Sequence, residues 1–312
     1  KSRQFVITFS VLLFAALAWT VVGSLTMMPQ IYTTPSAPRM LIGYYLVLAL
    51  PMLLVVPLAA YRSLEGEIDD GTLELLSIST LTPWQIVLGK LASAMLQMML
   101  YFVALFPCVA YAYTLRGVDL PTTMLILAAL IVAGVLLTIV ALFFAPMTKS
   151  RTGRITTLLA TMAILMGAEW GLAFLMIGMI LYGNPLTTAQ LYFAVIATIL
   201  LAAALGHLLL TATAAQLTPE SENRSTQIRL SMLGLTAVFL GVGTLGALML
   251  GREGIAVVMT LIVILGVLWT GCSSMMAAES PAMTPRIRRE LPSSFLARCL
   301  LTWLTPGPAT GL

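Results

Sequence analysis

The sequence predicts an all-α, polytopic membrane protein whose helix bundle crosses the bilayer about eight times. Three observations support this fold class. Hydrophobic residues make up 60% of the 312 residues and charged residues only 9%, a composition that soluble globular domains do not have. The apolar residues form stretches long enough to span the hydrocarbon core of a membrane. A long polar stretch at residues 63–90 interrupts the first half of the chain between two such segments.

The apolar segments can be followed in order. The first runs from about Phe5 to Met28 and is interpreted as a retained span rather than a signal peptide, because no cleavage motif follows it. The other seven predicted spans cover about residues 40–61, 91–114, 122–147, 155–182, 191–216, 230–250 and 255–276. Residues 1–277 are assigned to one transmembrane domain. Residues 278–312 are predicted to be a cytosolic or interfacial tail, or the start of a further span, and the chain is expected to be a fragment of a longer polypeptide.

Basic residues gather at alternate ends of the predicted spans. With the amino terminus in the cytosol, only Arg39, Arg116 and Arg252 fall on the outer side, and all other lysines and arginines fall inside. The positive-inside rule therefore predicts a multi-pass protein of the cytoplasmic (inner) membrane with a cytosolic amino terminus. It also places the polar stretch in the cytosol. The same distribution accounts for the formal net charge of +4 without nucleic acid as a partner.

The polar stretch is predicted to contain a short amphipathic helix. Asp69, Asp70 and Glu74 are expected near its start, where the helix dipole favours negative charge. Leu73 and Leu76 fall about one turn apart and form an apolar ridge on this polar segment. A helix of this kind, held at the membrane surface by two spans, is suited to docking onto a cytosolic partner.

A second helix is predicted to begin at the end of the polar stretch. Thr82 is a suitable N-cap, and Pro83 suits the first helical position. Gln85 follows the cap by three residues, as a capping box requires. This helix is expected to continue through Lys90 into the next span.

Two parts of this stretch, Gly-Thr-Leu-Glu-Leu-Leu at 71–76 and Leu-Thr-Pro-Trp-Gln-Ile-Val-Leu-Gly-Lys at 81–90, resemble the permease subunits of type-2 ATP-binding-cassette (ABC) transporters. In that family the corresponding segment follows the second span. It forms the coupling helix that seats in a groove of the ATPase subunit. The resemblance implies a set of ATPase contacts, which are Glu67, Gly71, Thr72, Leu73, Glu74, Leu75 and Leu76.

The resemblance also implies the rest of the assembly. A permease subunit pairs with a second permease, as a homodimer or heterodimer, and with ATPase subunits, most often for export. ATP and Mg²⁺ would then be bound by the ATPase, and this chain would hold no cofactor. In agreement, the sequence lacks a Gly-x-x-x-x-Gly-Lys-Ser/Thr loop, so the chain is not expected to be an enzyme by itself. Membrane lipid is a further expected partner, and the substrate is left open.

Two ionisable residues within predicted spans are further candidates. Glu169 lies in Gly-Ala-Glu-Trp-Gly, and an acid at membrane depth commonly faces a cavity or a partner. Its functional interpretations are a substrate contact or a proton carrier. The structural alternatives are a helix break that lifts it to the interface, with Trp170 as an anchor, or close helix packing through the two glycines. His207 is expected to be a hydrogen-bonded packing residue, because no other metal ligand is spaced with it. Glu169 and His207 together would make a proton path conceivable.

Two alternative functions remain open from the sequence. An ion- or proton-coupled secondary carrier would use Glu169 and move its substrate without ATP. A membrane assembly factor would bind its partner through the same cytosolic helix without transporting anything. Gly241-x-Gly243-x-x-Gly246 matches the dinucleotide fingerprint by letter, but it lies in an apolar segment with no preceding strand. Close helix packing is therefore expected at these glycines. No metal site is expected.

Overall fold

The computed structural model describes residues 2–28, 35–71, 82–115, 117, 120–148, 150–183, 187–218, 225–250, 252–278 and 294. All regular elements in these ranges are helices, and eight spans among them are long and apolar enough to cross a membrane. The prediction of an all-α, multi-pass membrane protein is therefore confirmed. The chain divides into two compact units, Lys1–Pro185 and Leu186–Leu312, which are described separately.

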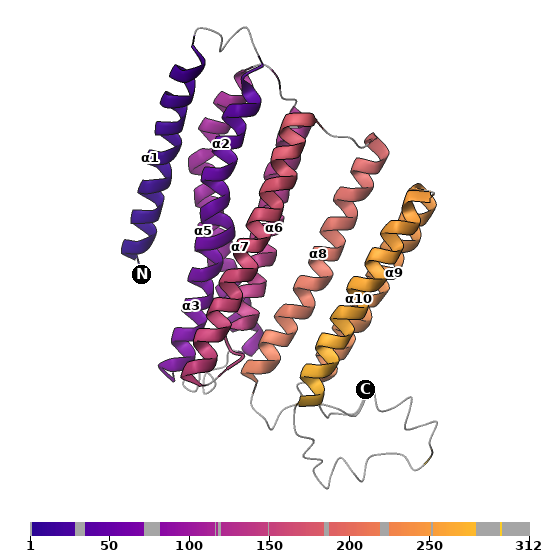
Figure 1. Ribbon diagram of the computed structural model, residues 1–312. Helices are drawn as coiled ribbons and strands as arrows, with labels where there is room; N and C mark the ends of the chain where they lie inside the picture. The colour runs from indigo at the N-terminus through magenta and orange to yellow at the C-terminus, as the bar shows by residue number, and fades with distance from the viewer. Residues whose placement is uncertain are drawn as a thin grey trace. The chain divides into compact units, whose positions relative to one another are not determined.

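Unit 1 contains five membrane-spanning segments (Figure 1). Its elements are α1 (Ser2–Met27), α2 (Ala37–Leu50), the π-helical turn η2 (Pro51–Val55), α3 (Val56–Asp69), α5 (Pro83–Thr114), α6 (Leu120–Phe144) and α7 (Arg151–Tyr182). Helix α2, η2 and α3 follow one another without a gap and form one span. The π-helical turn begins at Pro51, which has no N–H to donate to the preceding turn.

The span formed by α2, η2 and α3 is the centre of unit 1. Helices α1, α5 and α7 pack against α2, while α5 and α6 pack against α3. The central span also carries many of the fully buried large side chains of the unit, namely Met40, Tyr44, Leu48, Met52, Leu53, Tyr61 and Leu64. The core of unit 1 therefore surrounds this span, and the other helices expose more of their apolar surface, as lipid-facing helices do.

Helix α1 is held against α2 by close packing and hydrogen bonds. A Cβ at Gly43 of α2 would overlap the indole ring of Trp19, so only glycine leaves room for this ring. Trp19 Nε1 donates a hydrogen bond to the Met40 carbonyl at 3.2 Å. The hydroxyls of Thr20 and Tyr44 are 2.7 Å apart and share a second hydrogen bond. The first predicted span is thus an integral helix of the unit.

Unit 2 is a group of three helices, α8 (Thr188–Leu217), α9 (Ser225–Leu250) and α10 (Arg252–Ala278), in which α9 packs against both neighbours (Figure 1). Leu208 of α8 forms the core with Met232, Leu235 and Phe239 of α9. Trp269 of α10 packs against this core and donates a hydrogen bond from Nε1 to Thr236 Oγ1 at 3.0 Å.

The glycine motif that resembles a dinucleotide fingerprint lies inside α9 and serves helix packing. A Cβ at Gly243 would contact Val258 and Leu261 of α10 at 3.9 and 3.8 Å. A Cβ at Gly246 would come within 3.3 Å of the Phe193 ring of α8. The packing interpretation is therefore confirmed for these two glycines.

Replacing Gly254 with alanine should destabilise unit 2. The added Cβ would lie 2.6 Å from the carbonyl oxygen of Gly246 and 2.7 Å from Cα of Ala247, and backbone atoms cannot rotate away. We expect α10 to shift from α9 at a cost of about 1–3 kcal/mol. The midpoint of thermal unfolding of the purified protein in detergent checks this. The control is Gly266→Ala on the same helix, where an added Cβ meets nothing within 4 Å. If both variants melt together with wild type, the close contact between the helices is refuted.

Candidate functional site

The helices on either side of the predicted coupling segment meet at one end of unit 1. Helix α3 ends at Asp69, and Gly71 follows with φ of +66°, a left-handed conformation that favours glycine after a helix. The N–H groups of Asp70 and Gly71 donate to the carbonyls of Gly66 and Ile68 at 3.0 and 3.3 Å. This geometry closes the helix and turns the chain toward residues 72–81, which lie outside the described residues.

The prediction that Asp69 and Asp70 lie near the start of a short helix is wrong. Asp69 is the last residue of α3, and the second span continues beyond its predicted end near Tyr61. Carboxylates are disfavoured at a helix C-terminus by the dipole. The sequence argument missed the compensation, which is an ion pair between Asp69 and Arg154 of α7.

The predicted start of the next helix is confirmed. The N–H of Gln85 donates to Thr82 Oγ1 at 3.4 Å, and the N–H of Thr82 donates to Gln85 Oε1 at 3.0 Å. These two bonds form a capping box, with Pro83 in the first turn of α5. The chain therefore leaves residues 72–81 through a fixed, capped helix start.

Two ion pairs fix the end of α3 to its neighbours, and we call them the α3 anchor. Glu67 of α3 pairs with Lys90 of α5, with 28% and 19% of their side chains exposed, and Asp69 pairs with Arg154. Lys90 Nζ also donates to Ser63 Oγ at 2.8 Å.

A neutral hydrogen bond reinforces the contact between α3 and α7. The hydroxyl of Tyr61, which is fully buried, lies 3.1 Å from Thr157 Oγ1 of α7. Together with the α3 anchor, this bond ties α3 to both α5 and α7 at the end from which the coupling segment leaves.

The structure locates only two of the seven predicted ATPase contacts. Glu67 and Gly71 belong to the end of α3, whereas Thr72, Leu73, Glu74, Leu75 and Leu76 lie outside the described residues. The Glu67 carboxylate pairs with Lys90 within the chain, so it holds α3 against α5. The signal for this role was in the sequence: an acid and a base stand on either side of the same predicted loop.

Glu169 lies in the unbroken helix α7 and is half-buried. The continuous helix contradicts the expected break at this residue. The alternative of close packing through Gly167 and Gly171 is also not met within the described residues, because a Cβ at either glycine would have no neighbour within 4 Å. Helix α7 packs against α2, where the Tyr45 hydroxyl lies within electrostatic range of Glu169.

Tyr45 of α2 carries a buried polar group within a membrane span. Its side chain is 3% exposed, and its hydroxyl has no hydrogen-bond partner among the described residues. A buried hydroxyl without a partner costs about 1–3 kcal/mol. Tyr45 on α2 and Glu169 on α7 therefore place two polar groups in membrane-spanning helices that pack against each other.

His207 differs from the prediction. It lies on α8 of unit 2 with an exposed side chain, and so it is not a buried packing residue. Its backbone carbonyl accepts a hydrogen bond from Thr211 Oγ1 at 2.7 Å. Because His207 and Glu169 belong to different units, their pairing in a proton path stays a prediction.

The Glu67–Lys90 pair should contribute a measurable coupling energy. We expect a double-mutant cycle of Glu67→Ala and Lys90→Ala to give about 1 kcal/mol, because both side chains are mostly withdrawn from solvent. Reversible unfolding in mixed detergent micelles measures it. The matched cycle pairs Lys90→Ala with Asp70→Ala, an exposed acid past the end of α3, and should give a value near zero. Equal values in both cycles would contradict a specific pair.

No group of three or more His, Cys, Asp or Glu side chains that could hold a metal ion occurs among the described residues. The polar features of unit 1 described above are instead two ion pairs at one end and the separate polar residues Tyr45 and Glu169 within the spans. Comparison with protein-family models, with curated proteins and with solved structures found no match to this chain.

Proposed function

We propose that this chain is the permease subunit of an ATP-driven transporter of the type-2 ABC kind, and that residues 72–81 couple it to a separate ATPase subunit. The observation that carries the proposal is the α3 anchor. The coupling segment leaves from the end of a span that ion pairs fix to both α5 and α7. A partner that pushes on this segment would therefore move three helices together.

The geometry of the central span supports this coupling. Helices α2 and α3 and the turn η2 form one continuous span of 33 residues, which corresponds to roughly 50 Å of helix. Most residues of its most apolar stretch are buried inside the protein. A displacement at the anchor would thus be transmitted along the packed core rather than absorbed in a loop.

The distribution of charge supports a cytosolic position for the anchor. Arg62, Lys90 and Arg154 lie at the anchor end of unit 1, and Arg39 lies at the opposite end of the central span. The positive-inside rule favours the anchor end as the cytosolic one. In this orientation the coupling segment would face an ATPase, the amino terminus would be cytosolic, and the protein would reside in the inner membrane. A second permease would complete the assembly.

Replacing Leu76 with aspartate should release the ATPase while leaving the permease in the membrane. An unpaired carboxylate in an apolar groove is costly, so we expect roughly tenfold less ATPase to co-purify in mild detergent. The control is Ile78→Asp, which adds the same charge to the same segment two positions from Leu76, where the side chain does not share the face of Leu73 and Leu76 on the predicted helix. Normal co-purification with Leu76→Asp, or release by both variants alike, would refute docking through the ridge.

A secondary carrier is the second candidate function, and Glu169 favours it. A half-buried acid within a span is the kind of group that proton-coupled carriers use. This function requires no partner ATPase. It predicts that the chain alone moves protons or a cation across the membrane.

The carrier function can be tested in proteoliposomes that contain only this chain and a pH-sensitive dye. If Glu169 carries protons, a membrane potential should drive acidification without ATP, and Glu169→Gln should abolish it because the amide cannot ionise. Asp70→Asn, which removes an exposed acid outside the spans, should have no effect. The ABC proposal instead predicts no proton flux in wild type.

A further inference from the structure

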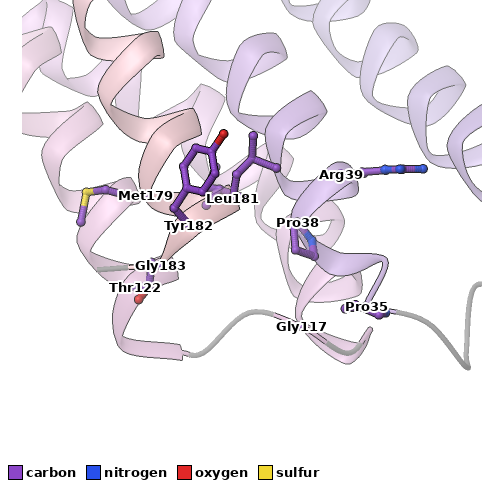
Figure 2. Close-up of a pocket in the computed structure, with 10 residues that line it drawn as sticks. Pro35, Pro38, Arg39, Gly117, Thr122, Met179, Leu181, Tyr182 and Gly183 are labelled. Carbon is purple, nitrogen blue, oxygen red and sulfur yellow. The ribbon is translucent and has the colours of Figure 1, made fainter. Parts of the chain in front are cut away.

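A pocket of about 480 Å³ lies at the end of unit 1 opposite the α3 anchor (Figure 2). The start of α2, the start of α6 and the end of α7 surround it, together with Gly117 from the connection between α5 and α6. This volume lies within the range of sites that bind small molecules or headgroups. Because the walls are the ends of membrane-spanning helices, the pocket would lie at the level of a membrane interface.

One wall of the pocket is apolar and uncovered. Met179, Leu181 and Tyr182 from the last turn of α7 line it, and 52% of Leu181 and 89% of Tyr182 are exposed. Figure 2 shows Tyr182 and Leu181 side by side, pointing away from the loops that carry Pro35 and Gly117. Aromatic side chains at the ends of spans commonly sit at the headgroup level of a bilayer. This wall is suited to contact with the upper part of an acyl chain.

The other side of the pocket carries positive charge. Arg39 is the only charged residue among the described residues that line it, and Figure 2 shows its side chain extended in the direction away from Leu181 and Tyr182. Arg39 lies in the first turn of α2, which begins at Ala37, and its side chain is exposed.

Close packing holds the start of α2, which carries Arg39, against the connection between α5 and α6. Gly117 has a φ of +114°, and a Cβ at this position would lie 2.7 Å from Cβ of Pro35 and 3.2 Å from Cδ of Pro38. The loop after α5 thus lies directly against the start of α2. The rigid rings of the two prolines limit the movement of the backbone that carries Arg39. The backbone at the start of α2 is therefore held in place without a bound ligand.

We propose that this pocket binds an anionic phospholipid at the outer end of unit 1. The guanidinium of Arg39 holds the phosphate of the headgroup. The α7 wall contacts the glycerol backbone and the first methylene groups of an acyl chain. An apolar wall beside a cation matches an amphiphile better than free phosphate, which would leave the wall unused. The site does not depend on the proposed ATPase coupling.

Native mass spectrometry of the full chain, released from detergent with equimolar phosphatidylglycerol and phosphatidylcholine, tests the proposal. The wild-type protein should retain phosphatidylglycerol in preference to phosphatidylcholine. Arg39→Gln should reduce this preference roughly tenfold, because a charge-assisted hydrogen bond to the phosphate is lost. Arg39→Lys should keep most of it. The control is Arg62→Gln, an exposed arginine at the anchor end, which should retain the wild-type preference.

Two further measurements distinguish binding of a whole phospholipid from binding of its phosphate group alone. Tyr182→Ala should lower retention of both lipids, because it removes apolar wall and leaves Arg39 in place. Excess inorganic phosphate should not displace phosphatidylglycerol. Equal retention of the two lipids by wild type, or an unchanged preference in Arg39→Gln, would overturn the site. Full displacement by inorganic phosphate would overturn its assignment to lipid.

Discussion

The ion pairs at the end of α3 are the constraint on which the proposed coupling depends. Asp69 stands at the C-terminus of a helix, where the dipole disfavours a carboxylate, and Arg154 of α7 offsets this cost. Glu67 and Lys90 are each less than a third exposed, so removing one would leave the other poorly solvated. The four charges therefore fix α3, α5 and α7 in one arrangement.

This arrangement gives the central span two chemically different ends. At the anchor end, the charges of Glu67 and Asp69 are neutralised by Lys90 and Arg154 within the protein. At the other end, Arg39 stands beside an apolar wall that no described residue covers. The first end is suited to transmitting force from a partner, and the second is suited to holding an amphiphile in the bilayer. Between them, Tyr45 of α2 and Glu169 of α7 are polar residues within the packed spans.

The features that sequence reasoning predicted well are local ones. Eight apolar segments were sufficient to locate the spans, because hydropathy is read over a window of neighbouring residues. The capping box of Thr82 and Gln85 depends on a spacing of three residues and was equally accessible. The end of α3 was not predicted, because Asp69 is stabilised by Arg154, which is 85 positions later in the chain. The surroundings of Glu169 were missed for the same reason, since they depend on Tyr45 of another helix.

The turn η2 shows how a membrane bundle accommodates irregular backbone. Pro51 cannot donate a hydrogen bond, and an unpaired carbonyl facing lipid would be costly. The structure places η2 inside the unit, where Met52 and Leu53 are fully buried. Helix α6 covers it closely, because a Cβ at Gly134 would lie only 3.3 Å from the Met52 carbonyl oxygen. The one irregular turn of the central span is thus protected by protein, and a glycine of α6 allows the two backbones to approach.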